Sequence, residues 1–246
     1  MSDLPALGWD AAVASAYRCF DRPDTCPGRV LRAERGVCTV LTPGGVDRAS
    51  LAGNLLLSTA GYPADLPCAG DWVVVRRWPD RRTTVELVLP RRTALTENQP
   101  LAANVDTVAV VEPLHPRPDE ALIGRLLTLA RQSGAQPVIV LTKCDLARDP
   151  QLILRKLRET APGVRTQLTS TRTRAGLDDL RDLVPPGRTL ALLGRPGAGK
   201  SALVSVLVGA GAPTVPGSLI PLAGGGAVLD LTAGRDPAPA AQASRR

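Results

Sequence analysis

The feature that most constrains the fold is a phosphate-binding loop late in the chain. Residues 194–201 read Gly-Arg-Pro-Gly-Ala-Gly-Lys-Ser and fit the pattern G-x-x-x-x-G-K-S/T. An apolar strand over residues 189–193 precedes this segment and a helix follows it, which is the context that such a loop requires. An ordinary glycine-rich turn is the alternative. The chain has only three lysines in 246 residues, so a chance match to this pattern is rare.

Each part of this loop has an expected role. Glycines let the backbone wrap so that its amide groups face phosphate oxygens, and the following helix adds its positive N-terminal end. Lys200 is expected to reach the β and γ phosphates, and Ser201 to ligate a magnesium ion. The candidate phosphate-binding residues are Gly194, Arg195, Pro196, Gly197, Ala198, Gly199, Lys200 and Ser201.

A second motif follows an earlier apolar strand, residues 137–141. The next four residues, Thr142, Lys143, Cys144 and Asp145, form a variant of the guanine motif N-K-x-D of GTPases. An aspartate carboxylate can accept hydrogen bonds from N1 and the exocyclic amine of guanine, a pairing that adenine does not offer, so a generic ATPase is the weaker alternative. Alone, the tetrapeptide would suit a surface turn better. The assignment as a guanine motif is strengthened because two of the three lysines in the chain fall in this motif and the phosphate loop.

A polar triplet ends the next strand. Thr169-Ser170-Thr171 follows residues 164–168 and stands where GTPases have a backbone-donating S-A motif. Ser170 is therefore a further candidate for the guanine site, with a polar strand-end turn as the alternative.

The chain divides near residue 97. Beyond it, apolar strands alternate with amphipathic helices, which indicates a parallel sheet covered on both faces. Before it, short strands at 29–32, 37–41, 71–77 and 83–89 alternate with glycine and proline turns, which predicts a small antiparallel barrel. We expect a barrel over residues 1–97, an α/β P-loop domain over 98–236 and a disordered Pro/Ala-rich tail over 237–246.

The net charge of +7 suits an anionic partner, although a solvated basic surface explains it equally well. One predicted hairpin concentrates arginines around an aromatic ring, an arrangement that could contact RNA backbone and stack on a base. The same charges could merely keep an edge strand soluble. The candidate RNA-binding residues are Arg76, Arg77, Trp78, Arg81 and Arg82.

Other function classes find little support in the sequence. The five cysteines are scattered and the chain has one histidine, so we expect no zinc site. Residues 1–10 lack the pattern of a secretory signal, and prolines and glycines interrupt the uncharged stretch 201–229, so we expect no membrane span. We expect a cytoplasmic monomer.

The order of the motifs is unusual, because the guanine motifs precede the phosphate loop. A circularly permuted GTPase domain behind a small barrel resembles the RsgA (YjeQ) family of ribosome-assembly GTPases. The likeness extends to Leu-Pro-Arg-Arg-Thr-Ala-Leu at 89–95, Ala-Ala-Asn-Val-Asp at 102–106 and Gln-Pro-Val-Ile-Val-Leu at 136–141. It includes Ala-Gly-Asp-Trp-Val at 69–73 in the barrel and covers about residues 7–236.

The resemblance implies a GTPase that binds the small ribosomal subunit, is stimulated by it and acts late in its maturation. The barrel would be an OB-fold that contacts ribosomal RNA. Thr142, Lys143 and Asp145 would read guanine in GTP or GDP, residues 194–201 would hold the phosphates, and Asp230 would help Ser201 hold magnesium.

Three departures from the family pattern bear on GTP hydrolysis and leave the nucleotide-binding motifs in place. Only residues 209–220 fill the first switch, where Thr214 is a poor magnesium ligand and no histidine occurs. The D-T-P-G motif reads Asp230-Leu-Thr-Ala233, with Gly234 one position later, and no C-terminal zinc domain is expected. We therefore assign no catalytic residue and predict slow GTP hydrolysis or none. The alternatives are a non-catalytic nucleotide- or RNA-binding relative, and a decayed relative without nucleotide function.

Overall fold

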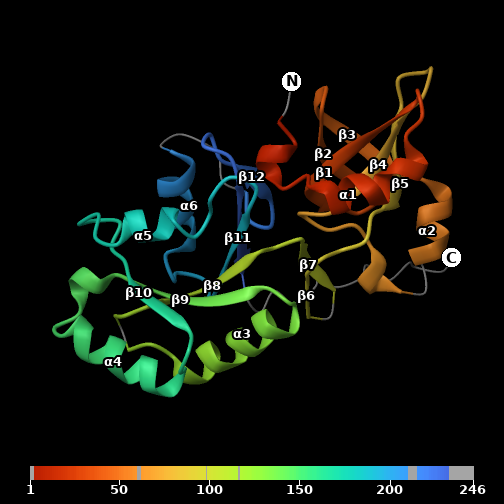
Figure 1. Cartoon of the computed structure of the whole chain (residues 1–246). Coiled ribbons are helices and arrows are strands. Elements are labelled where there is room, and N and C mark those ends of the chain that lie inside the picture. The colour runs from red at the N-terminus through yellow and green to blue at the C-terminus, as the bar shows by residue number, and fades with distance from the viewer. Residues whose placement is uncertain (1–2, 60–61, 98, 116, 210–214, 233–246) are drawn as a thin grey trace, which may run out of the picture.

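The computed structural model describes residues 3–59, 62–97, 99–115, 117–209 and 215–232. Its N-terminal part is a closed five-stranded barrel with strand order β1-β2-β3-β5-β4, beside which the short helices α1 and α2 lie (Figure 1). Neighbouring strands are antiparallel except for β3 and β5, which are parallel. This confirms the predicted OB-fold barrel. Its elements are η1 (Pro5–Leu7), α1 (Ala11–Tyr17), η2 (Arg18–Phe20), β1 (Thr25–Glu34), β2 (Val37–Thr42), β3 (Gly45–Leu51), α2 (Gly53–Thr59), η3 (Pro63–Asp65), β4 (Trp72–Arg77) and β5 (Thr83–Val88).

The second part is a six-stranded sheet with strand order β10-β9-β8-β11-β13-β12. All neighbours are parallel except β12, which pairs antiparallel with β13. The predicted α/β P-loop architecture is therefore confirmed. The elements are β8 (Thr107–Pro113), α3 (Glu120–Gln132), β9 (Gln136–Thr142), η4 (Cys144–Leu146), α4 (Pro150–Thr160), β10 (Arg165–Leu168), α5 (Leu177–Arg181), β11 (Thr189–Gly194), α6 (Lys200–Val208), β12 (Leu219–Pro221) and β13 (Ala227–Thr232).

Helices cover both faces of this sheet, with α3 and α4 on one face and α5 and α6 on the other (Figure 1). Leu126, Ile139 and Leu141 belong to the largest of the three buried clusters among the described residues, whereas Leu180 and Leu203 belong to the second. Strands buried on both faces explain the nearly continuous apolar runs in the sequence.

The two longer helices begin where the sequence supplies capping residues. The Asp119 carboxylate accepts a hydrogen bond from Leu122 N at the start of α3, and Asp149 accepts one from Leu152 N at the start of α4. Pro150 occupies the first helical position of α4, where a missing amide hydrogen has no consequence. These two caps fix where the chain turns back toward the sheet after β8 and β9.

A two-stranded sheet of β6 (Ala94–Thr96) and β7 (Pro100–Ala103) lies between the two parts, and the proposed boundary at residue 97 falls in its turn. The predicted tail, residues 237–246, lies outside the described residues. None of the described helices combines the length and the apolar character needed to cross a membrane.

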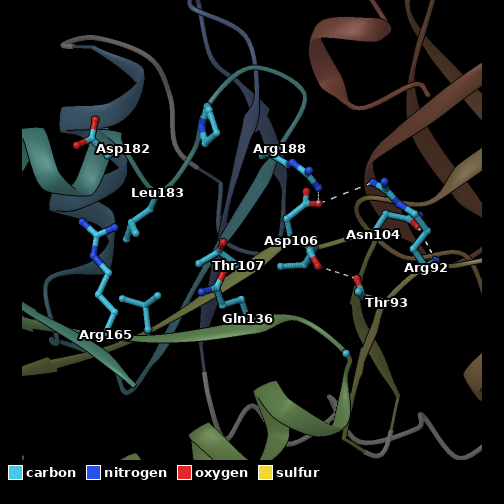
Figure 2. A pocket seen from close by; sticks show the side chains of 14 residues that line it. Arg92, Thr93, Asn104, Asp106, Thr107, Gln136, Arg165, Asp182, Leu183 and Arg188 are labelled. Carbon is cyan, nitrogen blue, oxygen red and sulfur yellow. Dashed lines mark hydrogen bonds and ion pairs between the residues drawn. The ribbon is translucent and has the colours of Figure 1, made fainter. Parts of the chain in front are cut away.

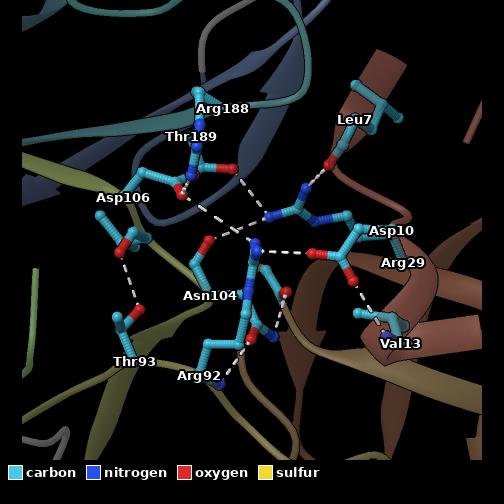
Figure 3. A network of polar contacts seen from close by, with 12 residues as sticks. Leu7, Asp10, Val13, Arg29, Arg92, Thr93, Asn104, Asp106, Arg188 and Thr189 are labelled. Carbon is cyan, nitrogen blue, oxygen red and sulfur yellow. Dashed lines mark hydrogen bonds and ion pairs between the residues drawn. The ribbon is translucent and has the colours of Figure 1, made fainter. Parts of the chain in front are cut away.

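One buried arginine joins the barrel to the sheet (Figure 3). Arg29 of β1 donates hydrogen bonds to Leu7 O, Asn104 O and Thr189 Oγ1, and its guanidinium stacks on Trp72 at 5.0 Å. Burial lowers the pKa of Arg29 to about 10. Because Thr189 opens β11, this side chain fixes the barrel against the strand that leads to the phosphate loop.

Replacing Arg29 is expected to lower the free energy of unfolding. Arg29→Ala removes several hydrogen bonds from a charged donor and leaves buried acceptors without a partner. The free energy of unfolding should fall by about 3 kcal/mol. Arg29→Lys should rescue little, because one ammonium group cannot reproduce the planar fork of donors. Chemical denaturation measures the effect, and Arg32→Ala on the same strand is the control, since within the described residues Arg32 forms one exposed ion pair, with Glu34. Equal stability of the two alanine variants would contradict this role.

Candidate functional site

The phosphate loop leaves the end of β11 in a conformation that needs its glycines. A Cβ atom at Gly194 would lie 2.3 Å from Val111 O of the neighbouring strand β8, which is closer than a real Cβ approaches. Gly197 and Gly199 have φ angles of +78° and +97°, in the left-handed region that glycine adopts freely. The sequence therefore forms a wrapped loop that ends where α6 begins.

Lys200, the first residue of α6, is folded back over this loop. Its Nζ donates hydrogen bonds to Gly194 O and Arg195 O, both at 2.9 Å. Burial lowers the pKa of Lys200, and the nearby Asp230 carboxylate opposes this shift. The ammonium is thus held inside the loop, where the phosphates of a nucleotide would meet it.

Ser201 and Asp230 meet beside the loop. Ser201 Oγ donates to Asp230 Oδ2 at 2.8 Å, although 29 residues separate them in the chain. Asp230 is buried on β13, and within the described residues its Oδ1 has no hydrogen-bond partner. A buried carboxylate oxygen without a donor, next to a hydroxyl, suits the oxygen ligands that magnesium prefers.

The guanine-motif residues are bonded directly to the phosphate loop. Thr142 Oγ1 donates to Ala198 O at 2.6 Å, and Lys143 Nζ donates to Gly197 O at 3.0 Å. Lys143 has a φ of +57°, an uncommon conformation for lysine that begins the turn η4. The two motifs therefore form one continuous surface at the carboxyl ends of β9 and β11.

Asp145 is positioned by the next strand-end loop. Its Oδ1 accepts a hydrogen bond from Ser170 Oγ at 2.6 Å, and its Oδ2 pairs with Arg172 Nε at 2.8 Å. These two contacts, Ser170 first, lower the pKa of Asp145, so that it is an ionised acceptor at neutral pH. The half-buried Cys144 precedes it, and its amide donates to Thr169 O at 3.2 Å.

Two residues at this site are absent from the sequence-based candidates. Arg172 contacts Asp145, and Glu112 at the end of β8 forms a 2.7 Å ion pair with Arg195 of the phosphate loop. Glu112 is 1% exposed, and burial raises its pKa. The sequence could have indicated Glu112, because it is a charged residue within the apolar run of β8. Nothing in the sequence singles out Arg172.

The RNA-binding candidates lie on the barrel hairpin, and most of them are already paired with one another or with carboxylates of the barrel. Arg76 and Arg82 lie over the Trp78 ring, with guanidinium-to-centroid distances of 4.0 and 5.5 Å. Three of the four arginines also form ion pairs, Arg76 with Asp24, Arg77 with Asp47 and Arg82 with Asp80. The turn residue Arg81 has a φ of +68°. A base that stacked on the Trp78 face beneath Arg76 would displace that guanidinium.

A hollow of about 600 Å³ lies elsewhere, along the starts of the parallel strands (Figure 2). Asp106 ties together two arginines near it, pairing with Arg188 at 2.7 Å and lying 4.0 Å from Arg92. Arg92 also pairs with Asp10 of the barrel part at 2.8 Å. None of the candidate nucleotide-binding residues lines this hollow, which forms part of the junction between barrel and sheet.

The order of strands and motifs defines the class of protein. A P-loop sheet with its guanine motif before its phosphate loop, behind a closed barrel, is a circularly permuted GTPase-type domain. The chain belongs to the RsgA GTPase family, whose family model matches residues 84–216.

Individual relatives agree with this assignment. The small ribosomal subunit biogenesis GTPase RsgA of Streptomyces coelicolor is 39% identical over 93% of this chain and 68% of its own length. The protein of the same name from Streptomyces avermitilis is 40% identical over 84% of this chain, but only 57% of its own length is matched. Among solved structures, YjeQ from Thermotoga maritima has a TM-score of 0.68 at 25% identity, covering 85% of this chain and 74% of that one.

Arg172→Ala is expected to strengthen guanine-nucleotide binding. The guanidinium occupies Asp145 Oδ2, one of the two oxygens that a guanine base would need. Because Arg172 is largely exposed, the gain should be at most about fivefold in Kd. Titration with a fluorescent GDP analogue measures it, with Arg174→Ala on the same loop as the control. Weaker binding by Arg172→Ala would instead make Arg172 a direct contact of the nucleotide.

Proposed function

We propose that the chain binds GTP and GDP at the carboxyl edge of its parallel sheet. The observation that carries this proposal is the pair of hydrogen bonds from Thr142 and Lys143 to the carbonyls of Ala198 and Gly197. They join a base-reading segment to a phosphate-binding segment in one site. Ligands of open α/β sheets bind outside the carboxyl ends of the strands, which is where these two segments lie.

Each segment has a separate role toward the nucleotide. Asp145 accepts the two N–H groups of guanine, while Ser170 keeps its carboxylate in position. The wrapped backbone from Gly194 to Gly199 presents amides to the phosphates, and Lys200 supplies a positive charge. The Glu112–Arg195 ion pair anchors the loop to β8.

Ser201 and Asp230 are the residues that would hold a magnesium ion. Their oxygens lie 2.8 Å apart, and Asp230 Oδ1, which has no hydrogen-bond partner among the described residues, supports a cation at this place. When bound, magnesium would neutralise phosphate charge. Asp230 also holds the segment before β12, since its backbone carbonyl accepts a hydrogen bond from Gly217 N at 2.8 Å.

The wider role that we propose is that of the relatives, which are named small ribosomal subunit biogenesis GTPases. The chain spans 57–68% of the length of three of these curated relatives. In this role the barrel hairpin from Arg76 to Arg82 contacts ribosomal RNA, and the chain acts as a cytoplasmic monomer.

We further propose that hydrolysis is slow. Water positioning and charge stabilisation in the transition state depend on the two switches. Thr214, Ala233 and Gly234, at the altered switch positions, lie outside the described residues. The short stretch between α6 and β12 favours the second candidate function, which is nucleotide or RNA binding without GTP hydrolysis.

Nucleotide titration tests the binding site. Lys200→Ala is expected to weaken GTP binding at least about a hundredfold, because a buried cation between the phosphates is lost. Fluorescent GTP and GDP analogues with magnesium give the two dissociation constants. The control is Lys156→Ala, which removes an exposed lysine on α4. Unchanged affinity in a folded Lys200→Ala protein would contradict the proposed site.

A single-turnover assay of GTP hydrolysis tests whether hydrolysis is slow. We expect GTP cleavage well below the rate of ordinary GTPases, both alone and with purified small ribosomal subunits. A subunit-stimulated rate equal to that of ordinary GTPases, abolished in Lys200→Ala, would contradict slow turnover and favour an active enzyme. Equal affinity for GTP and GDP without any turnover would favour the non-catalytic relative.

A further inference from the structure

An apolar groove of about 570 Å³ lies beside the guanine motif. It runs between the segment after β8 and the start of α4, on the face of the sheet that α3 and α4 cover (Figure 1). Leu114 and Leu157 are buried in its floor. Leu146 and Leu152 also line it, yet these two side chains are 51% and 42% exposed.

The exposure of two leucines in one groove is informative. Single exposed apolar residues are ordinary, but apolar surface gathered in a concave site and bordered by polar residues marks an interaction site. Leu146 follows Asp145 directly in the chain, and its amide donates to Lys143 O at 3.0 Å. Leu114 N likewise donates to Thr142 O at 2.8 Å. An occupant of the groove would therefore contact the loop that carries the guanine motif.

The rim of the groove is positively charged. Arg117, Arg148 and Lys156 line it, and within the described part of the chain none of the three forms an ion pair. Two carboxylates share the rim. Asp149 is engaged as the cap of α4, and Glu120 belongs to the first turn of α3. Three basic side chains against these two carboxylates leave unmatched positive charge around an apolar floor.

We propose that this groove binds an acidic amphipathic helix of a protein partner. A helix that lays its apolar face into a groove uses residues spaced i, i+3, i+4 and i+7 as anchors. The exposed leucines would receive those anchors, and glutamates or aspartates flanking the apolar face would pair with Arg117, Arg148 and Lys156. Such pairing steers association and sets specificity.

Two other occupants fit the groove less well. Single-stranded RNA is held by stacking its bases on planar side chains, whereas this floor is aliphatic. His115 supplies the one aromatic ring among the groove residues that the structure describes. A second copy of this chain would bring the same positive rim to the groove, where like charges repel.

Peptide display on the whole 246-residue chain tests the proposal. A library of helix-forming peptides is selected against the chain, and the enriched peptides are synthesised for binding measurements. We expect enriched sequences with an apolar stripe at helical spacing flanked by Asp and Glu. Their binding should weaken with added salt, because exposed ion pairs are screened.

Matched variants locate the binding surface. The double variant Leu146→Ser/Leu152→Ser and the double variant Arg117→Glu/Lys156→Glu should each weaken peptide binding at least about tenfold. The controls are Leu57→Ser, which changes an 80% exposed leucine on α2, and Arg165→Glu on β10. All four proteins should keep the unfolding midpoint and the nucleotide affinity of the parent chain, since the substituted side chains are exposed.

Four results would overturn the proposal. The first is a selection without enriched peptides, or with neutral or basic ones. The second is an acidic peptide that binds all groove variants as tightly as the parent chain. The third is concentration-dependent dimerisation that Leu146→Ser/Leu152→Ser abolishes, which would assign the groove to a second copy. Displacement of the peptide by an RNA oligonucleotide of unrelated sequence would likewise make the groove an RNA site.

Discussion

The candidate site depends on the direct bonds between two loops that lie far apart in the chain. Thr142 and Lys143 donate to the carbonyls of Ala198 and Gly197 across separations of 56 and 54 residues. The parallel sheet makes this possible, because it brings the carboxyl ends of β9 and β11 to one edge with only β8 between them. Circular permutation changes the order of the motifs along the chain and leaves this spatial relation intact.

The same strand connects the site to the barrel. β11 begins at Thr189, which accepts a hydrogen bond from the buried Arg29, and ends at Gly194 in the phosphate loop. Arg92 adds a second tie near that end, since it pairs with Asp10 of the barrel part and lies 4.0 Å from Asp106, which accepts a hydrogen bond from Thr189 N. Barrel and phosphate loop are therefore held at opposite ends of one buried strand, which gives the two parts of the molecule a fixed relation.

Much of this arrangement is predictable from local sequence. The strands that carry the motifs are apolar runs bounded by turns, and Asp119 and Asp149 mark their helix starts. β3 escapes prediction because the burial of Gly45–Leu51 alternates regularly while its residue types do not, since the apolar Val46 is 60% exposed and the charged Asp47 lies on the less exposed side. Arg29 and Glu112 escape for another reason. Charged residues are ordinarily exposed, and only tertiary packing supplies the partners that allow them to be buried.

Guanine recognition by Asp145 is the central claim, and an exchange of base specificity tests it most directly. Xanthine carries a carbonyl where guanine has its exocyclic amine, so an asparagine amide can donate to it. Competition binding should show that the parent chain prefers GTP over XTP and ATP. Asp145→Asn should prefer XTP. A variant that still prefers GTP, or a parent chain that binds ATP as tightly as GTP, would contradict the assignment of this edge of the sheet as a guanine-nucleotide site.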